Sequence, residues 1–410
     1  MKRLLDASAV LVICILLVSC TSAAPASPTS APAAPPATSP PASPAPKPSA
    51  AVSVSPSTGA SPSVSPSPSP AAAAGAASSN PVASAPLTTE PSGPPLNPQV
   101  KITVGDNQTL GVADVYIALD RGYYQQEGLT IDLPQLGAPQ VTIQALATSQ
   151  INFAIANPDP SLFNAFDRSL DMKMMAALTR NKPGDHPASF MVRSDLIDSG
   201  QFHSPKDLVG HPVGVPALQS QFYVDLVMQK DGLGASDVDI KQFQAPGDLI
   251  TAFASKSIDA GWTADPTVTQ IVSQGLAKVV YVTGDLFPGA VGATLAMSPN
   301  YGKDQPDAAY RFVYATMRGH VDYYHAFIAK DVDKAPIVQI LINHTPIKDP
   351  KLYDTIGLAS VDLVPHMDTQ SWEVLQAYFV KIGLQDHPAD LASHVDNSFI
   401  DKAAAQMGLH

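Results

Sequence analysis

From residue 100 onward, short apolar runs of strand type alternate with stretches whose apolar residues recur at helical spacing. Strands are predicted at 100–104, 130–133, 151–156 and 173–178. Helices are predicted between them, at 112–126, 141–148 and 161–166. A regular alternation of strand and helix predicts parallel strands joined by right-handed crossovers.

The same alternation starts again after residue 205. Strands are predicted at 212–215, 239–243, 258–262 and 279–283, with helices at 205–209, 222–230, 248–254 and 267–274. Two extended apolar segments, 188–193 and 291–297, are interpreted as crossings between the two groups. After Pro299 the pattern is helical, at 307–329, 335–344, 351–356, 369–382 and from 399 onward. We therefore predict an α/β protein of two lobes, joined by two segments, with a ligand cleft between them.

The first 98 residues have a different pattern. A basic start, Met1-Lys2-Arg3, precedes an apolar run that ends in Leu17-Val18-Ser19-Cys20, which is the layout of a secretory signal with a lipobox cysteine. Residues 21–98 are nearly all Ala, Pro and Ser, with too few large apolar side chains to build a core, so they predict an extended tether. The predicted organisation is a signal peptide at 1–20, a tether at 21–98, the first lobe at 99–193, the second lobe at 194–290, and a return to the first lobe at 291–410.

Composition and charge exclude several classes of function. The chain has 24 Lys and Arg against 36 Asp and Glu, a net charge of −12, which argues against a nucleic-acid partner. Of its two cysteines, Cys14 would leave with the signal and Cys20 would carry the lipid, so no thiol remains for a disulfide, a zinc site or a nucleophile. The ten histidines show no metal-binding spacing, and no Gly-x-Ser-x-Gly or phosphate-loop motif occurs. We expect no metal, no cofactor and no enzymatic activity.

Four short motifs follow one another in a fixed order. They are Tyr116 to Tyr124 continuing to Glu127-Gly128-Leu129, then Ala145 to Gln150, Lys206 to Val215, and Ala264-Asp265-Pro266. Together they resemble the type II periplasmic-binding-protein family, which includes nitrate, sulfonate, taurine and thiamine-pyrimidine-precursor receptors. Two features depart from the family pattern: Ser149 replaces a glycine, and Trp262 lies further from the acid–proline pair than the usual aromatic residue.

The resemblance implies an extracytoplasmic receptor that captures a small polar solute by closing its lobes. It also implies an ABC permease and its ATPase as partners, attachment to the cell membrane through the lipid on Cys20, and a monomeric state. The family's synthase branch needs a cysteine-rich motif that is absent here. A lipoprotein that uses the same fold to sense a ligand and signal to a membrane partner is the alternative.

Loops at the carboxyl ends of the predicted strands are the candidate ligand site, because ligands of open α/β sheets bind there and meet the amides of helix N-termini. The candidate ligand-binding residues are Asn107, Gln108, Thr109, Asn157, Asp159, Gln219, Ser220, Gln221, Trp262 and Asp265. The two carboxylates have a second interpretation as helix caps, and Trp262 either stacks on a planar ligand or fills the core between the lobes. These loops contain no Lys or Arg, and their carboxylates favour a nitrogen-bearing or zwitterionic solute; nitrate and sulfonate remain possible through backbone amides.

Overall fold

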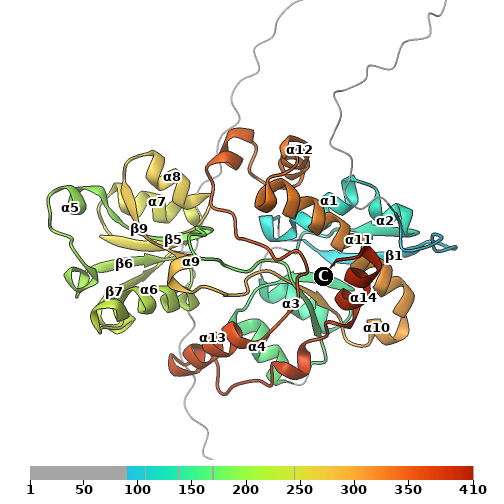
Figure 1. Cartoon of the computed structure of the whole chain (residues 1–410). Coiled ribbons are helices and arrows are strands. Elements are labelled where there is room, and N and C mark those ends of the chain that lie inside the picture. The colour runs from blue at the N-terminus through green and yellow to red at the C-terminus, as the bar shows by residue number, and fades with distance from the viewer. Residues whose placement is uncertain (1–89, 107, 137–138, 169, 244, 410) are drawn as a thin grey trace, which may run out of the picture. The chain divides into compact units, whose positions relative to one another are not determined.

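The computed structural model describes residues 90–106, 108–136, 139–168, 170–243 and 245–409 (Figure 1). The predicted signal peptide, Cys20, most of the predicted tether and the candidate ligand residue Asn107 lie outside the described residues. Within the described part, none of the helices combines the length and the apolar character needed to cross a bilayer.

The first lobe is built on a five-stranded sheet with the order β2-β1-β3-β10-β4. Its strands are β1 (Val100–Gly105), β2 (Leu129–Asp132), β3 (Phe153–Ala156), β4 (Lys173–Ala177) and β10 (Thr294–Met297). The strand β1 is parallel to β2 and β3, whereas β10 is antiparallel to β3 and β4. Every residue of β3 is buried, as expected for a central strand with helices on both faces. The first helices of this lobe are α1 (Ala113–Asp120), α2 (Tyr123–Gln126), α3 (Pro139–Ala147) and α4 (Pro160–Asp167).

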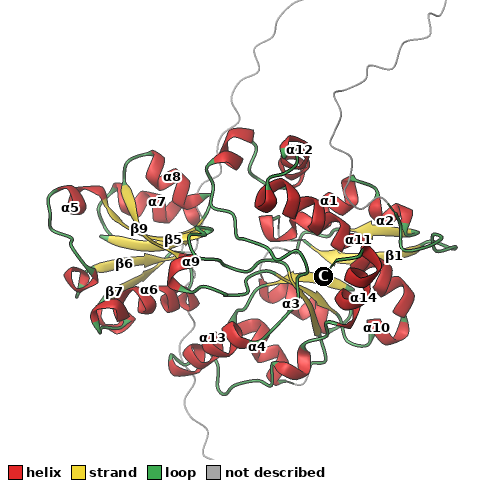
Figure 2. Ribbon diagram, viewed as in Figure 1, coloured by secondary structure: helices red, strands yellow, loops and turns green. Residues whose placement is uncertain are grey.

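The second lobe has its own five-stranded sheet, with the order β7-β6-β8-β5-β9. Its strands are β5 (Ala188–Arg193), β6 (Pro212–Val215), β7 (Asp239–Gln242), β8 (Ala260–Ala264) and β9 (Ala277–Val282). Its helices are α5 (Ser194–Asp198), α6 (Gln221–Met228), α7 (Pro246–Ala254), α8 (Thr267–Ser273) and α9 (Thr283–Leu286). Figure 2 shows helices on both faces of each sheet.

The interpretation of 188–193 and 291–297 as lobe crossings is wrong. Residues 188–193 form β5, which lies between β8 and β9 inside the second sheet, and most of 291–297 is β10 inside the first. The predicted end of the first lobe at residue 193 is therefore too late. The segments that cross between the sheets precede these strands, at 178–187 and 287–293 (Figure 1).

The predicted end of the tether at residue 98 is also too late. Residues 90–98 pack against the first lobe, where the Ser92 amide donates a 2.6 Å hydrogen bond to the carboxylate of Glu127, and Arg311 forms a 3.0 Å ion pair with the same group. Because Glu127 is fully buried, it needs both partners. The backbone of Leu96 also donates to the Glu127 carbonyl oxygen.

The helices after β10 complete the first lobe. They are α10 (Tyr301–Asp304), α11 (Pro306–Tyr323), α12 (Ala335–His344), α13 (Gln370–Lys381) and α14 (Ser398–Met407). The predicted helix at 351–356 is instead a short 3-10 turn, Pro350–Asp354. In α11, 15 of the 18 residues are buried, and the helix packs directly on α1.

A buried ion pair joins α1 to α11. Nδ1 of His320 lies 2.8 Å from a carboxylate oxygen of Asp114, and Nε2 lies 2.7 Å from the carbonyl oxygen of Asp362. Both partners accept, so the ring donates from both nitrogens and is an imidazolium. Burial alone lowers the pKa of His320, but the Asp114 carboxylate and the Asp362 carbonyl outweigh burial and leave this pKa raised.

We expect this pair to stabilise the protein at neutral and lower pH and to lose its effect as the solution becomes alkaline. A histidine whose pKa is higher in the folded state gives its full stabilisation below the unfolded pKa and loses it as the pH rises through the folded pKa. Urea unfolding of the wild type and His320→Gln between about pH 6 and pH 9 measures this, because glutamine cannot take up the proton. The stability difference between the two proteins should shrink with rising pH; a constant difference would contradict the charged state of His320.

Candidate functional site

A cavity of about 340 Å³ lies where the two lobes meet the crossing segments. The first lobe lines it with the start of α3, the loop after β3 and one face of α13. The second lobe contributes the turn before α6, α6 itself and β8, and the crossing segments supply the rest. The lining residues are Pro139, Asn157, Pro158, Asp159, Asn181, Gln219, Ser220, Tyr223, Trp262, Ala290, Val291, Gly292, Leu375 and Phe379.

The structure brings five of the ten predicted ligand residues together at this cavity: Asn157, Asp159, Gln219, Ser220 and Trp262. They come from both lobes, in agreement with the expectation that ligands of open α/β sheets bind near the carboxyl ends of the strands.

Four other predicted residues, Gln108, Thr109, Gln221 and Asp265, do not line the cavity. After β1, the Gln108 amide donates to the carboxylate of Asp106 at 2.8 Å, so this amide is already bonded to the end of its own strand. A ligand role for these four residues remains a prediction.

Asp159 is both a helix cap and a cavity residue. Its Oδ1 accepts hydrogen bonds from the Leu162 amide at 3.0 Å and from the Ser161 hydroxyl at 2.5 Å, which caps α4. Burial raises the pKa of Asp159, and the two hydrogen bonds oppose this increase. The carboxyl group therefore favours a ligand that brings an N–H group or a positive charge to it.

Asp265 acts as a helix cap, which is the second of its two interpretations from the sequence. Its Oδ1 accepts from the amide and the hydroxyl of Thr269, at 2.9 and 2.7 Å, near the start of α8. Its Oδ2 accepts from the Gly357 amide at 2.5 Å. The carboxylate thus caps a helix and ties the second lobe to a segment of the return chain.

Trp262 lines the cavity and stacks on a residue that the sequence did not single out. The rings of Trp262 and Tyr223 are 4.4 Å apart and inclined by 3°, so one face of the indole is covered by the phenol. The Nε1 atom of Trp262 is buried and has no hydrogen-bond partner among the described residues. Burial raises the pKa of Tyr223 to about 12, so its hydroxyl stays protonated and able to donate. The cavity wall therefore contains an aromatic pair, while the indole N–H of Trp262 is buried without a partner among the described residues.

The helix α13 gives the cavity an apolar wall. Leu375 and Phe379 are four residues apart and share one face of this helix. Tyr378, on the neighbouring face, meets Phe222 of α6 with ring centroids 5.4 Å apart, so α13 touches the second lobe. The sequence predicted the helix, but no local pattern showed that it lies against the other lobe.

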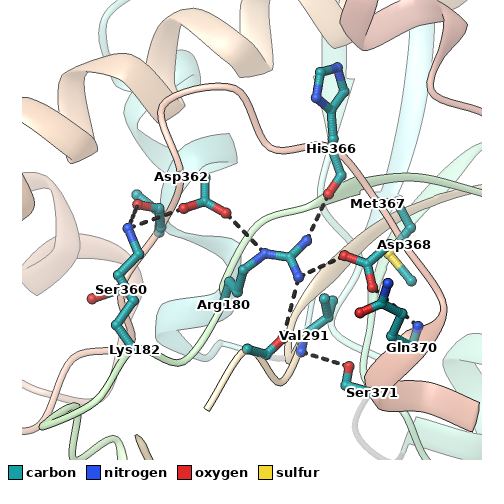
Figure 3. A network of polar contacts seen from close by, with 12 residues as sticks. Arg180, Lys182, Val291, Ser360, Asp362, His366, Met367, Asp368, Gln370 and Ser371 are labelled. Carbon is teal, nitrogen blue, oxygen red and sulfur yellow. Dashed lines mark hydrogen bonds and ion pairs between the residues drawn. The ribbon is translucent and has the colours of Figure 1, made fainter.

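The two cations that flank the lining residue Asn181 in the sequence form ion pairs with carboxylates (Figure 3). Arg180, next to the lining residue Asn181, forms ion pairs of 2.9 Å with Asp362 and 2.7 Å with Asp368. Lys182 lies 3.1 Å from the other oxygen of Asp362. Among the described residues, no Lys or Arg lines the cavity, and no group of three or more metal-ligating side chains occurs.

Comparison with known proteins gives the family. A family model described as NMT1/THI5 like matches residues 110–326, more than half of the chain. The chain belongs to the NMT1/THI5-like family. The riboflavin-binding protein RibY of Chloroflexus aurantiacus is similar to this NMT1/THI5-like chain, with 22% identity over 332 residues, 78% of this chain and 92% of RibY.

Solved structures confirm the fold predicted from the resemblance, a type II periplasmic binding protein. The periplasmic sulfonate-binding protein SsuA from Methylobacillus flagellatus superposes with a TM-score of 0.62 at 14% identity, over 77% of this chain and 97% of SsuA. The desulfurization enzyme DSZB superposes with a TM-score of 0.56 at 16% identity, over 75% of this chain and 99% of DSZB. The same fold therefore occurs in binding proteins and in an enzyme, so the fold alone does not distinguish the two functions. Relatives by sequence, such as RibY, are named binding proteins, and this NMT1/THI5-like chain is a solute-binding protein of that type.

Proposed function

We propose that the protein captures a small planar, nitrogen-containing solute in the cavity between its lobes and delivers it to an ABC importer. The observation that carries this proposal is the composition of the cavity. It combines the stacked pair of Tyr223 and Trp262 with three side-chain amides, from Asn157, Asn181 and Gln219. Aromatic faces and fixed amides suit a flat ring whose edge carries donors and acceptors.

Nitrate and sulfonate fit this cavity poorly. An anion bound there would lie in a cavity lined by the Asp159 carboxyl group, without a basic side chain to offset its loss of hydration. The start of α4, which would otherwise offer free amides, is capped by Asp159 itself. RibY, named for riboflavin, points to the same ligand class, since the ring system of riboflavin is planar and rich in nitrogen.

Capture proceeds by hinge closure in this proposal. Each lobe supplies part of the lining, so bound solute stabilises the form in which the lobes are closed and shifts the population toward it. The closed receptor then docks on a permease, whose ATPase drives import. The receptor acts as a monomer outside the cytoplasm, held to the membrane by a lipid on Cys20.

The ligand class is tested by thermal unfolding of the full-length protein with matched sets of compounds. Riboflavin, cytosine and thymine represent flat nitrogen rings, and nitrate and ethanesulfonate represent the anions. A ligand at 100 times its dissociation constant adds about 2.7 kcal/mol to the stability, which is an easily measured shift. We expect a shift with at least one ring compound and none with the anions. A shift with the anions alone would refute the proposed class.

The lipid anchor is tested separately, by membrane fractionation of cells that express Cys20→Ser. The variant should move from the membrane fraction to the soluble fraction, because it lacks the sulfur that carries the lipid. Cys14→Ser is the matched control and should remain with the membrane. If both variants remain there, the protein is not anchored through Cys20.

A further inference from the structure

A segment of the return chain, Gly357–Asp368, runs beside the first crossing segment; we call it the strap. The Arg180 amide of the first crossing segment donates to the carbonyl oxygen of Ser360 at 2.8 Å, and the Ala177 amide donates to that of Pro365 at 2.9 Å. On its other side, Arg180 forms a β-bridge with Val291 of the second crossing segment. The three pieces of chain thus lie together at the junction of the lobes (Figure 3).

The strap is bonded to both lobes. At its first residue, the Gly357 amide donates to Asp265 of the second lobe. The fit is tight, because a side chain on Gly357 would place its Cβ only 1.7 Å from the His186 carbonyl oxygen. Near its other end, the backbone of Met367 exchanges two 2.9 Å hydrogen bonds with the side chain of Asn397 in the first lobe. The strap is therefore a third link between the lobes, in addition to the two crossing segments.

Arg180 holds these pieces together with one guanidinium group. Its nitrogens meet the carboxylates of Asp362 and Asp368 and, at 2.9 Å, the carbonyl oxygen of His366, all three on the strap. A further bond of 3.3 Å goes to the carbonyl oxygen of Gly289 on the second crossing segment. Its side chain is only 19% exposed, so the ion pairs are partly shielded from water.

Arg180 is next to the cavity wall. Asn181, the following residue, lines the cavity, and so does Val291, the bridge partner of Arg180. Val291 is held further by α13, because its amide donates to the Ser371 hydroxyl and its carbonyl oxygen accepts from the Trp372 indole, both at 3.0 Å. A change in how the three pieces of chain are joined would therefore move the cavity wall.

We propose that Arg180 is a positioning residue that clamps the strap to both crossing segments and so restricts the angles that the lobes can adopt. The importance of this restriction for capture rests on the proposed function. The clamp itself is tested without any ligand, so either proposal can fail alone.

The test measures distances between the lobes in the full-length protein with both native cysteines replaced by serine. Spin labels on cysteines introduced at the exposed positions Lys101, in β1, and Lys241, in β7, report the distance by pulsed electron paramagnetic resonance. Arg180→Gln should broaden the distance distribution relative to the wild type. An unchanged distribution would overturn the clamp.

Arg193→Gln is the matched control. Arg193 also makes two ion pairs, with Asp195 at 2.8 Å and Asp259 at 2.7 Å, but all its partners lie within the second lobe. The Arg193→Gln variant should have a lower melting temperature than the wild type but an unchanged distribution of distances between the lobes. If both variants broaden the distribution equally, the effect is general destabilisation and the clamp is refuted.

A double variant, Asp362→Asn with Asp368→Asn, keeps Arg180 and removes the charges that hold it. It gives an independent answer if Arg180→Gln does not fold. The double variant should broaden the distribution as well, and a wild-type distribution in a folded double variant would overturn the proposal.

Discussion

Replacing Gly319 by alanine should destabilise the protein by about 3 kcal/mol, because α11 and α1 touch at this glycine through their backbones. A Cβ at Gly319 would lie 2.2 Å from the Asp114 carbonyl oxygen and 3.0 Å from the Ala118 nitrogen. These are backbone atoms of α1, so the two helices would have to separate. That movement would disturb the buried pair of Asp114 and His320 and the largest apolar cluster of the first lobe.

Gly247→Ala is the matched control and should change the stability in the opposite direction. Gly247 also lies in a helix, α7, but apart from its chain neighbours and the backbone of its own helix, no described atom lies within 4 Å of the position of its missing Cβ. Alanine in an open helical position stabilises by about 0.5 kcal/mol, mainly by restricting the unfolded chain. Urea unfolding of both variants measures the two changes. If Gly319→Ala and Gly247→Ala were equally stable, the close approach of α1 and α11 would not be present in solution.

Trp262→Ala should weaken binding of the solute by about a hundredfold, because it removes the largest aromatic ring that lines the cavity. Tyr223 would remain but would lose the ring that holds it parallel. Calorimetric titration with the ring compound that gives the largest thermal shift measures the affinity.

Trp262→Phe tests whether the contribution comes from the aromatic ring. Phenylalanine keeps a flat but smaller ring against Tyr223, so this variant should bind more tightly than the alanine variant and less tightly than the wild type. Wild-type affinity in Trp262→Ala would remove the indole from the ligand site.

Local patterns were sufficient for most of the fold. The predicted strands at 100–104, 130–133 and 212–215 match β1, β2 and β6, since each is a short apolar run between turn residues. The errors arose where a strand has only distant, antiparallel partners. Phe190 of β5 pairs with Trp262, and Thr294 of β10 pairs with Ala156. The residues next to these positions in the sequence do not indicate either pairing.

The candidate site likewise contains residues that local sequence predicts and residues that it does not. Asn157 and Gln219 lie in the loops that follow β3 and β6, so the loop rule finds them. Asn181 and Phe379 instead reach the cavity from a crossing segment and from α13. Asp265 had a predicted capping role, but its bond to Gly357 could not be predicted because that residue is 92 residues away in the chain. The predicted tether ran too far for a similar reason: nothing near Ser92 shows that a buried carboxylate, Glu127, needs it.

The most direct test of the account is whether the solute touches Trp262. The chain has only two tryptophans, so Trp372→Phe leaves Trp262 as the sole indole, lining the cavity. In this full-length variant, titration with the ring compound selected by thermal unfolding should quench or shift the tryptophan emission and saturate at one ligand per chain. If equilibrium dialysis shows one bound ligand while the emission of Trp262 stays unchanged, the solute binds elsewhere and the cavity between the lobes is not the capture site.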